Sequence, residues 1–149
     1  MAVAAFKGGE ALTRRLREIA QRIKSAEAVR VGFLEGATYP DGTSVGLIAA
    51  IQEFGASSQG IPPRPFFRTM IAAKKREWGP ALAGELKASD YDAKKALGVL
   101  GEGIAGQLRQ SIIDLISPPL APATIARKGS DKPLVDTGHM LDSVDKEVI

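Results

Sequence analysis

The chain of 149 residues contains no cysteine, one histidine and few aromatic residues. Without cysteine it can form neither a disulfide framework nor a thiolate metal site. Because aromatic residues make up 5% of the chain, the core must consist mainly of leucine, isoleucine, valine and alanine. The longest apolar run, residues 45–51, is far shorter than the roughly 20 residues that cross a bilayer. The start of the chain has no secretory pattern. These absences predict one soluble domain over residues 1–149, with no membrane partner.

The common catalytic and cofactor motifs are missing as well. His139 has no neighbouring residues of the metal-ligand type, so we expect no metal site. The glycines of GVLGEG, residues 98–103, have the wrong spacing for a nucleotide loop and lie inside a predicted helix. No serine has a plausible histidine and aspartate relay. The sequence therefore predicts a protein that is not an enzyme and that holds no cofactor.

One segment, LVDTG at residues 134–138, resembles the active-site turn of retroviral-type aspartic proteases, in which two such aspartates share a proton. Only eleven residues follow it, too few to build a flap and a closing sheet. The long predicted helices also argue against an all-β protease. The alternative is that Asp136 caps a turn that uses Gly138.

The net charge of +3 is unevenly distributed along the chain. Residues 1–30 carry seven basic against three acidic residues, and residues 64–95 carry eight against four. Residues 136–149 carry one basic against four acidic residues. The basic segments are typical of solvated helix surfaces or of phosphate contact. Opposite charge at the two ends also permits head-to-tail contact between copies.

Hydrophobic periodicity predicts an α+β fold: an N-terminal amphipathic helix, a small and mostly antiparallel sheet, and two long helices packed on it. Residues 10–26 form the first helix, whose apolar residues recur at helical spacing: Leu12, Leu16, Ile19 and Ile23. Residues 28–35 and 143–149 read as strands. Since two strands alone are marginally stable, either partners near Tyr39 or Pro62 are missed or neighbouring subunits complete the sheet.

The stretch FGASSQGIPPRPFFR, residues 54–68, is stiff, apolar and basic. Its serines and glycine predict a flexible loop near 56–61, and its prolines then hold the backbone extended. Pro65 suits the first turn of a helix that Pro80 bends or interrupts. A second flexible segment is predicted near residues 127–133.

Glycines interrupt the third long helix, predicted over residues 93–116, at a cost of roughly 1 kcal/mol each relative to alanine. Gly101 lies on the apolar stripe, where a missing side chain lets another backbone approach. Gly103 and Gly106 project to the opposite side and leave a smooth second surface. Such a helix suits either a subunit with neighbours or a tolerant, flexible element.

The order of these motifs resembles the small neck and tail-completion proteins of tailed bacteriophages, the group related to the HK97 neck/tail component and to minor tail or virion-morphogenesis proteins. The likeness covers IQEFG at 51–55, IPPRPFFR at 61–68, two long helices, and LVDTG-x-M-L-x-S-V at 134–144. The matching signature residues are Glu53, Phe54, Gly55, Pro62, Arg64, Pro65, Phe66, Phe67, Asp136, Thr137 and Gly138.

This resemblance implies a structural protein of the virion at the head–tail junction, assembled in the cytoplasm of the bacterial host. It implies a ring of copies, commonly six-fold, around the DNA channel. The implied partners are connector or head-completion proteins and tail terminator or tail tube proteins, with weak contact to DNA. Relatives often continue beyond the segment that matches residues 144–149, so the mode of ring contact through the C-terminus stays open.

Two questions about the basic residues remain open in the sequence. Arg64, on a stiffened backbone, is expected to pair with a carboxylate such as Glu53 or Asp136, either within the subunit or from a neighbour. Phe54, Phe66 and Phe67 are expected to pin the loop to the core. The alternative function is a nucleic-acid-binding module that uses Arg14, Arg15, Arg17, Arg22, Lys74, Lys75 and Arg76, although no aromatic residues interleave with that charge.

Overall fold

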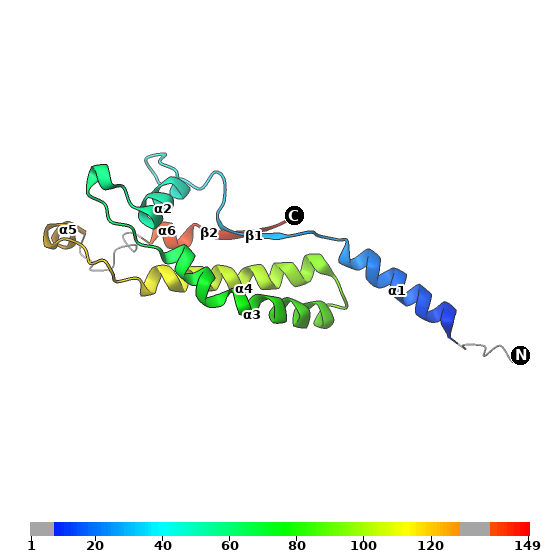
Figure 1. Ribbon diagram of the computed structural model, residues 1–149. Helices are drawn as coiled ribbons and strands as arrows, with labels where there is room; N and C mark the ends of the chain where they lie inside the picture. Colours follow the sequence, from blue (N-terminus) through cyan, green and yellow to red (C-terminus); the bar gives the residue numbers. More distant parts are fainter. Residues whose placement is uncertain (1–7, 129–137) are drawn as a thin grey trace, which may run out of the picture.

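The computed structural model describes residues 8–128 and 138–149, and over these residues the chain has the predicted α+β architecture (Figure 1). The helices are α1 (Gly9–Ile23), α2 (Val45–Phe54), α3 (Phe66–Ala88), α4 (Ala93–Asp114), α5 (Pro122–Lys128) and α6 (His139–Asp142). The strands are β1 (Val29–Phe33) and β2 (Val144–Val148), and a 3-10 turn spans Ser57–Gln59.

Local signals explain where several helices begin. The Ser44 hydroxyl accepts a hydrogen bond from the Leu47 amide at 3.3 Å, and the Asp92 carboxylate accepts one from the Lys95 amide at 3.1 Å. Both are N-caps that satisfy amides left open in the first helical turn. α3 runs unbroken through Pro80, so of the two predicted alternatives, a bend or an interruption, the interruption is wrong. Packing of α3 along α4 stabilises the helix against the loss of one backbone hydrogen bond.

The sheet is an antiparallel ribbon in which Val29 faces Val148 and Phe33 faces Val144. The sequence correctly predicts both strands. In the described residues the regions near Tyr39 and Pro62 form isolated bridges, Thr38 to Ser44 and Ala56 to Ile61, and add no third strand. The two outer edges of the ribbon therefore have no strand partner in the part of the chain that the structure describes.

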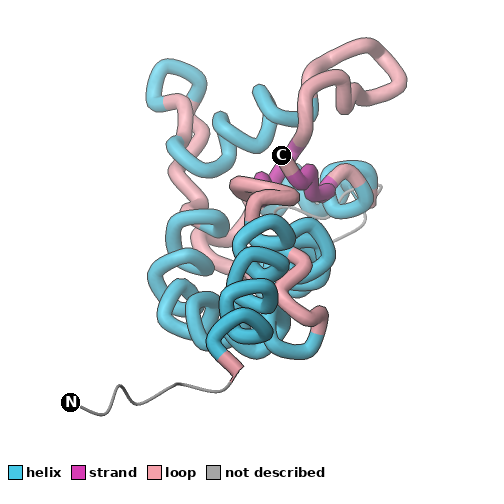
Figure 2. The backbone as a smooth tube through the Cα atoms, turned by 90° about the vertical axis from the view of Figure 1, so that its right-hand side faces the viewer, coloured by secondary structure: helices cyan, strands magenta, loops and turns pink. Residues whose placement is uncertain are grey.

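The ribbon lies between the α3–α4 pair and the layer that contains α2, as both views show (Figures 1 and 2). The core forms where α2, α3, α4, α6 and β2 meet, and its buried residues are Val45, Ala49, Phe66, Met70, Ala105, Leu108, Ile112, Met140 and Val144. Most of the predicted stripe on α4 is buried or half-buried there. Apolar burial from five elements thus holds one core together.

Gly101 lies directly beneath the ribbon. A Cβ atom at this position would lie 2.6 Å from Val29 Cγ2 and 3.1 Å from Lys146 Cδ. The close approach that the sequence predicted is therefore present, but side chains rather than backbone make it. Glu102, beside it, accepts a hydrogen bond from Lys146 Nζ at 2.7 Å and ties β2 to α4.

Two segments extend from this core. α1 leaves the body beyond the turn between α3 and α4, and α5 lies at the opposite end of that helix pair (Figure 1). Over the residues that the structure describes, no helix is both long enough and apolar enough to cross a membrane.

Candidate assembly surfaces

Glu53 joins the two signature motifs. The residue is 5% exposed, and its carboxylate accepts hydrogen bonds from the Phe67 amide at 2.9 Å and the Arg68 amide at 3.2 Å, both in the first turn of α3. Arg68 Nε donates a third bond at 2.6 Å. A carboxylate at a helix N-terminus satisfies open amides and interacts favourably with the helix dipole. The end of α2 thereby fixes the start of α3.

Gly55 makes the corner between these motifs sterically possible. Its φ is +76°, and a Cβ there would lie 2.8 Å from both the Ile61 carbonyl oxygen and the Pro63 nitrogen. Ala56 and Ile61 exchange two backbone hydrogen bonds, at 2.9 and 3.0 Å, and close the loop between them. The backbone of the corner therefore excludes a side chain at residue 55.

Within the chain Arg64 does not pair with Glu53, so an ion pair with that carboxylate of the same subunit is wrong, while a pair with a carboxylate of a neighbour stays a prediction. The residue is 5% exposed, and its guanidinium donates to Gln52 Oε1 at 3.2 Å and to the Pro118 carbonyl oxygen at 3.3 Å. Burial lowers the pKa of Arg64, but an arginine stays protonated in a protein. Among the described residues its partners are neutral oxygens, which tie the segment after α4 to the α2–α3 loop. The other predicted partner, Asp136, lies outside the described residues.

The three signature phenylalanines have different roles. Phe66 is fully buried and Phe67 half-buried, so both anchor the loop as predicted. Phe54 is 65% exposed, and the expectation that it pins the loop to the core is wrong. Its ring instead lies 5.0 Å from the Arg68 guanidinium carbon, a cation–π contact at the surface. Pro62 is exposed, and Pro65 precedes the first residue of α3.

A groove of about 740 Å³ runs between α3 and α4. We call it the α3–α4 groove; Phe66, Met70 and Ala73 line its α3 side, and Gly103 and Gly106 line its α4 side. A Cβ atom at either glycine would have nothing within 4 Å. The smooth second surface that the sequence predicted on α4 is thus an open apolar groove.

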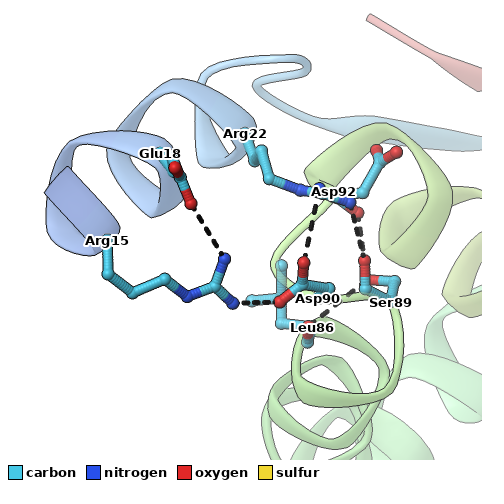
Figure 3. Close-up of polar contacts among 7 residues, drawn as sticks. All are labelled: Arg15, Glu18, Arg22, Leu86, Ser89, Asp90 and Asp92. Carbon is cyan, nitrogen blue, oxygen red and sulfur yellow. Dashed lines mark hydrogen bonds and ion pairs between the residues drawn. The ribbon is translucent and has the colours of Figure 1, made fainter. Parts of the chain in front are cut away.

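Polar contacts hold α1 to the turn between α3 and α4 (Figure 3). Arg15 and Arg22 both form ion pairs with Asp90, the latter at 3.3 Å. Arg22 also lies within hydrogen-bond distance of the Ser89 carbonyl oxygen, at 3.4 Å. The pKa of Asp90 lies below its ordinary value, mainly because of the hydrogen bond from Arg15. We call this cluster of Arg15, Arg22, Ser89 and Asp90 the α1 latch.

Most of the apolar stripe of α1 is not covered by the described part of the chain, although Ile19 is half-buried. Leu12, Leu16 and Ile23 are 51%, 57% and 44% exposed, and no residue of α1 is buried. The helix is thus attached through charged side chains while its apolar face is in contact with solvent. Contiguous exposed apolar surface of this kind is typical of an interaction site.

The sequence pattern did not predict the α1 latch. The segment SDYD reads as a helix cap, and Asp92 does cap α4, but Asp90 and Tyr91 adopt left-handed backbone conformations, with φ of +55° and +64°. This geometry presents the Asp90 carboxylate to α1. A non-glycine pair in this region of φ leaves no sequence signal beyond the aspartate itself.

His139 has a structural role in the described residues. Its Nε2 lies 2.7 Å from the Thr38 carbonyl oxygen, and its ring centroid lies 4.8 Å from that of Tyr39, with the two rings tilted by 33°. The described residues contain no cluster of side chains suited to hold a metal ion. Gly138 precedes α6 with a φ of +80°, while Asp136 and Thr137 lie outside the described residues.

Comparisons with family models, with curated proteins and with solved structures found no match to this chain.

Proposed function

We propose that this protein is a structural subunit of a phage virion, which assembles with copies of itself at the head–tail junction and joins connector to tail. The ring around the DNA channel and the named partners come from the motif resemblance. The structure contributes an independent reason to expect neighbours, because a folded subunit with an uncovered apolar helix face gains stability when another molecule covers that face.

The observation that carries the proposal is the exposed stripe of α1. Leu12, Leu16 and Ile23 are each more than two-fifths exposed although their spacing is that of a packed helix. The corner built by Glu53 supports the resemblance at a second point, because it gives the two separated motifs IQEFG and IPPRPFFR a shared structural role.

The alternative, a dedicated nucleic-acid-binding module, has weaker support. Arg15 and Arg22 are engaged by Asp90, and Lys74 lies 3.2 Å from the Glu77 carboxylate. Each pairing reduces the charge available for phosphate. Arg14 and Arg17 remain without an ion pair among the described residues, which agrees with weak contact to DNA in a channel.

Light scattering of the purified chain, alone and with connector and tail proteins, tests the proposal. We expect a discrete complex larger than one chain, and co-elution with at least one of those partners. A chain that remains a monomer in every mixture would contradict the proposal. Tight, salt-dependent binding of DNA by the isolated monomer would favour the alternative.

A further inference from the structure

We propose that the outer edge of β1 pairs with the same edge of a second copy of this chain. The two β1 strands run antiparallel across a two-fold axis, and the two ribbons form one four-stranded sheet. This inference goes beyond the ring in the proposed function, because it identifies the surface that two free subunits share. A sheet of two strands is marginally stable by itself, whereas a sheet of four is of ordinary size.

The backbone groups on the outer edge of β1 are open. Ala28 and Ile149 exchange two backbone hydrogen bonds, at 3.0 and 2.9 Å, so every second residue along the antiparallel ladder turns its N–H and C=O groups toward β2. The residues in between, Val29, Val31 and Phe33, turn theirs away from β2. None of these outward groups has a hydrogen-bond partner in the part of the chain that the structure describes. Such a row of unpaired groups is a template for another strand.

The outer edge of β2 is partly blocked. The outward carbonyl oxygen of Val144 accepts a hydrogen bond from Arg109 Nη2 at 2.7 Å. The outward amide of Lys146 donates to the Asp145 carboxylate at 2.7 Å. A strand therefore gains more hydrogen bonds at β1 than at β2. A contact between two copies through β1 joins like surfaces and closes at two copies, so the α1 stripe stays free for other neighbours.

The sequence of β1 is complementary to itself in one register. When Val31 lies opposite Val31 of the second copy, Val29 lies opposite Phe33, and all the outward groups of both strands pair. Arg30 then lies opposite Gly32, so no like charges face each other. The neighbouring register places Arg30 directly opposite Arg30 and leaves Phe33 without a strand partner. Like charges directly opposite each other destabilise a sheet, which selects the first register.

The side chains of β1 favour the same pair. Val29, Val31 and Phe33 are half-buried on the face of the ribbon that packs toward α4 and the core. In the four-stranded sheet they lie opposite apolar side chains of the second copy, so association covers apolar surface as well as backbone groups. An open pocket of about 320 Å³ borders Phe33 between α2 and α3, so the described residues leave space at this end of the strand.

The first test removes one outward amide. Val31→Pro deletes the amide at the centre of the pair but no hydrogen bond between β1 and β2, and proline is tolerated where the N–H group faces away from the ladder. Val148→Pro makes the same change on the outer edge of β2. We expect the native chain to dimerise and Val31→Pro to weaken dimerisation by at least about tenfold in analytical ultracentrifugation. Val148→Pro should dimerise like the native chain. Circular dichroism melting of each variant verifies that the monomer still folds.

The second test is disulfide trapping, which the absence of native cysteine makes specific. In the proposed register the two Val31 Cα atoms lie about 5.5 Å apart, a separation that a disulfide can span. The two Arg30 Cα atoms lie about 7–8 Å apart, which is too far. Val31→Cys should therefore form a disulfide-linked dimer under mild oxidation. Arg30→Cys, at the more exposed neighbouring residue, is the matched control and should not.

The outcomes separate this inference from the proposed function. A chain that is monomeric at every concentration overturns the inference, and so does a dimer that cross-links through Arg30→Cys and not through Val31→Cys. Larger oligomers that are insensitive to Val31→Pro overturn it as well, but they leave the proposed function intact. If Val31→Pro does not fold, the two cysteine variants decide.

Hydrogen exchange identifies a different occupant of the edge. A monomer whose amides at residues 29–33 become protected only when a connector or tail protein binds would assign the edge to that protein. This result would overturn the inference and support the proposed function. Protection of the same amides that rises with the concentration of the chain alone is the result that we expect.

Discussion

Two buried charges of opposite sign lie close together in the sequence, yet they do not pair. Glu53 is stabilised by the amides of Phe67 and Arg68 at the positive end of α3, and by the Arg68 side chain. Arg64 is stabilised by two neutral oxygens, on Gln52 and Pro118. Each charge fixes a different pair of segments. The corner therefore depends on the individual hydrogen bonds rather than on one ion pair.

Replacing Glu53 with glutamine tests this account of the corner. The amide keeps the shape of the side chain, but it removes the charge and one of the two acceptor oxygens that serve α3. We expect Glu53→Gln to lower the free energy of unfolding by about 1–3 kcal/mol, measured by urea denaturation. Glu35→Gln, at an exposed residue with no side-chain hydrogen bond among the described residues, should have no measurable effect. Equal stability of the two variants would contradict a capping role for Glu53.

Gly101 and Gly103 make a second comparison between single residues, because they lie two positions apart in α4 and have opposite surroundings. Gly101→Ala puts a methyl group against Val29 and Lys146, so we expect a loss of about 1–3 kcal/mol from overpacking. Gly103→Ala puts a methyl group into open space and should stabilise α4 by up to about 1 kcal/mol. Thermal and urea unfolding of both variants provide the measurement. A stabilised Gly101→Ala variant would show that the ribbon does not pack on α4 as described.

Among the helices, α1 differs from α3 and α4 in what holds it in place. α3 and α4 contribute buried apolar residues to one core, whereas α1 contributes none. The α1 latch consists of exposed ion pairs and hydrogen bonds around Asp90. Such contacts are weakened by salt and by loss of the carboxylate charge. The position of α1 should therefore respond to solution conditions that leave the core unchanged.

The pH dependence of the latch follows from the lowered pKa of Asp90. The carboxylate stays charged above its ordinary aspartate value, so the latch is complete there, and it is lost as the pH falls below about 4 and passes through the lowered pKa. Asp90→Asn should release α1 at neutral pH, since asparagine tolerates the left-handed backbone but carries no charge. Hydrogen exchange over residues 9–23 should speed up in this variant and not in Asp145→Asn. Unchanged exchange in Asp90→Asn would show that other contacts hold α1.

The whole subunit has an extended outline because α1 projects beyond the α3–α4 pair (Figure 1). The exposed residues Leu12, Leu16 and Ile23 lie on this projecting helix. The ribbon of β1 and β2 adds open strand edges in the described residues, a further surface on which a neighbour can pair.

Small-angle X-ray scattering of the chain, at a dilution at which it is monomeric, tests this outline. A compact chain of 149 residues has a radius of gyration of about 15 Å. We expect a clearly larger value for the monomer, and a value near the compact one for a chain that lacks residues 1–23. That shorter chain should still unfold cooperatively, because α1 buries no residue in the described core. A compact full-length monomer would mean that α1 folds back onto the body in solution.

Hydrophobic periodicity and turn residues were sufficient to predict the α+β class, both strands, the amphipathic α1 and the stripe on α4. These features depend on residues close in the chain, whose spacing alone decides which face becomes apolar. The cap at Asp92 was predictable for the same reason.

The partners of individual charges were not predictable in this way. The sequence offered Glu53 or Asp136 as a partner of Arg64, but in the folded chain Glu53 binds the N-terminus of α3 and Arg64 binds Gln52 and Pro118. Asp90 binds Arg15, which lies 75 positions away in the chain, from a left-handed turn for which the sequence has no signal. Local spacing determines which residues can be buried, whereas the packing of distant segments determines which donor reaches which acceptor, and which apolar face stays exposed.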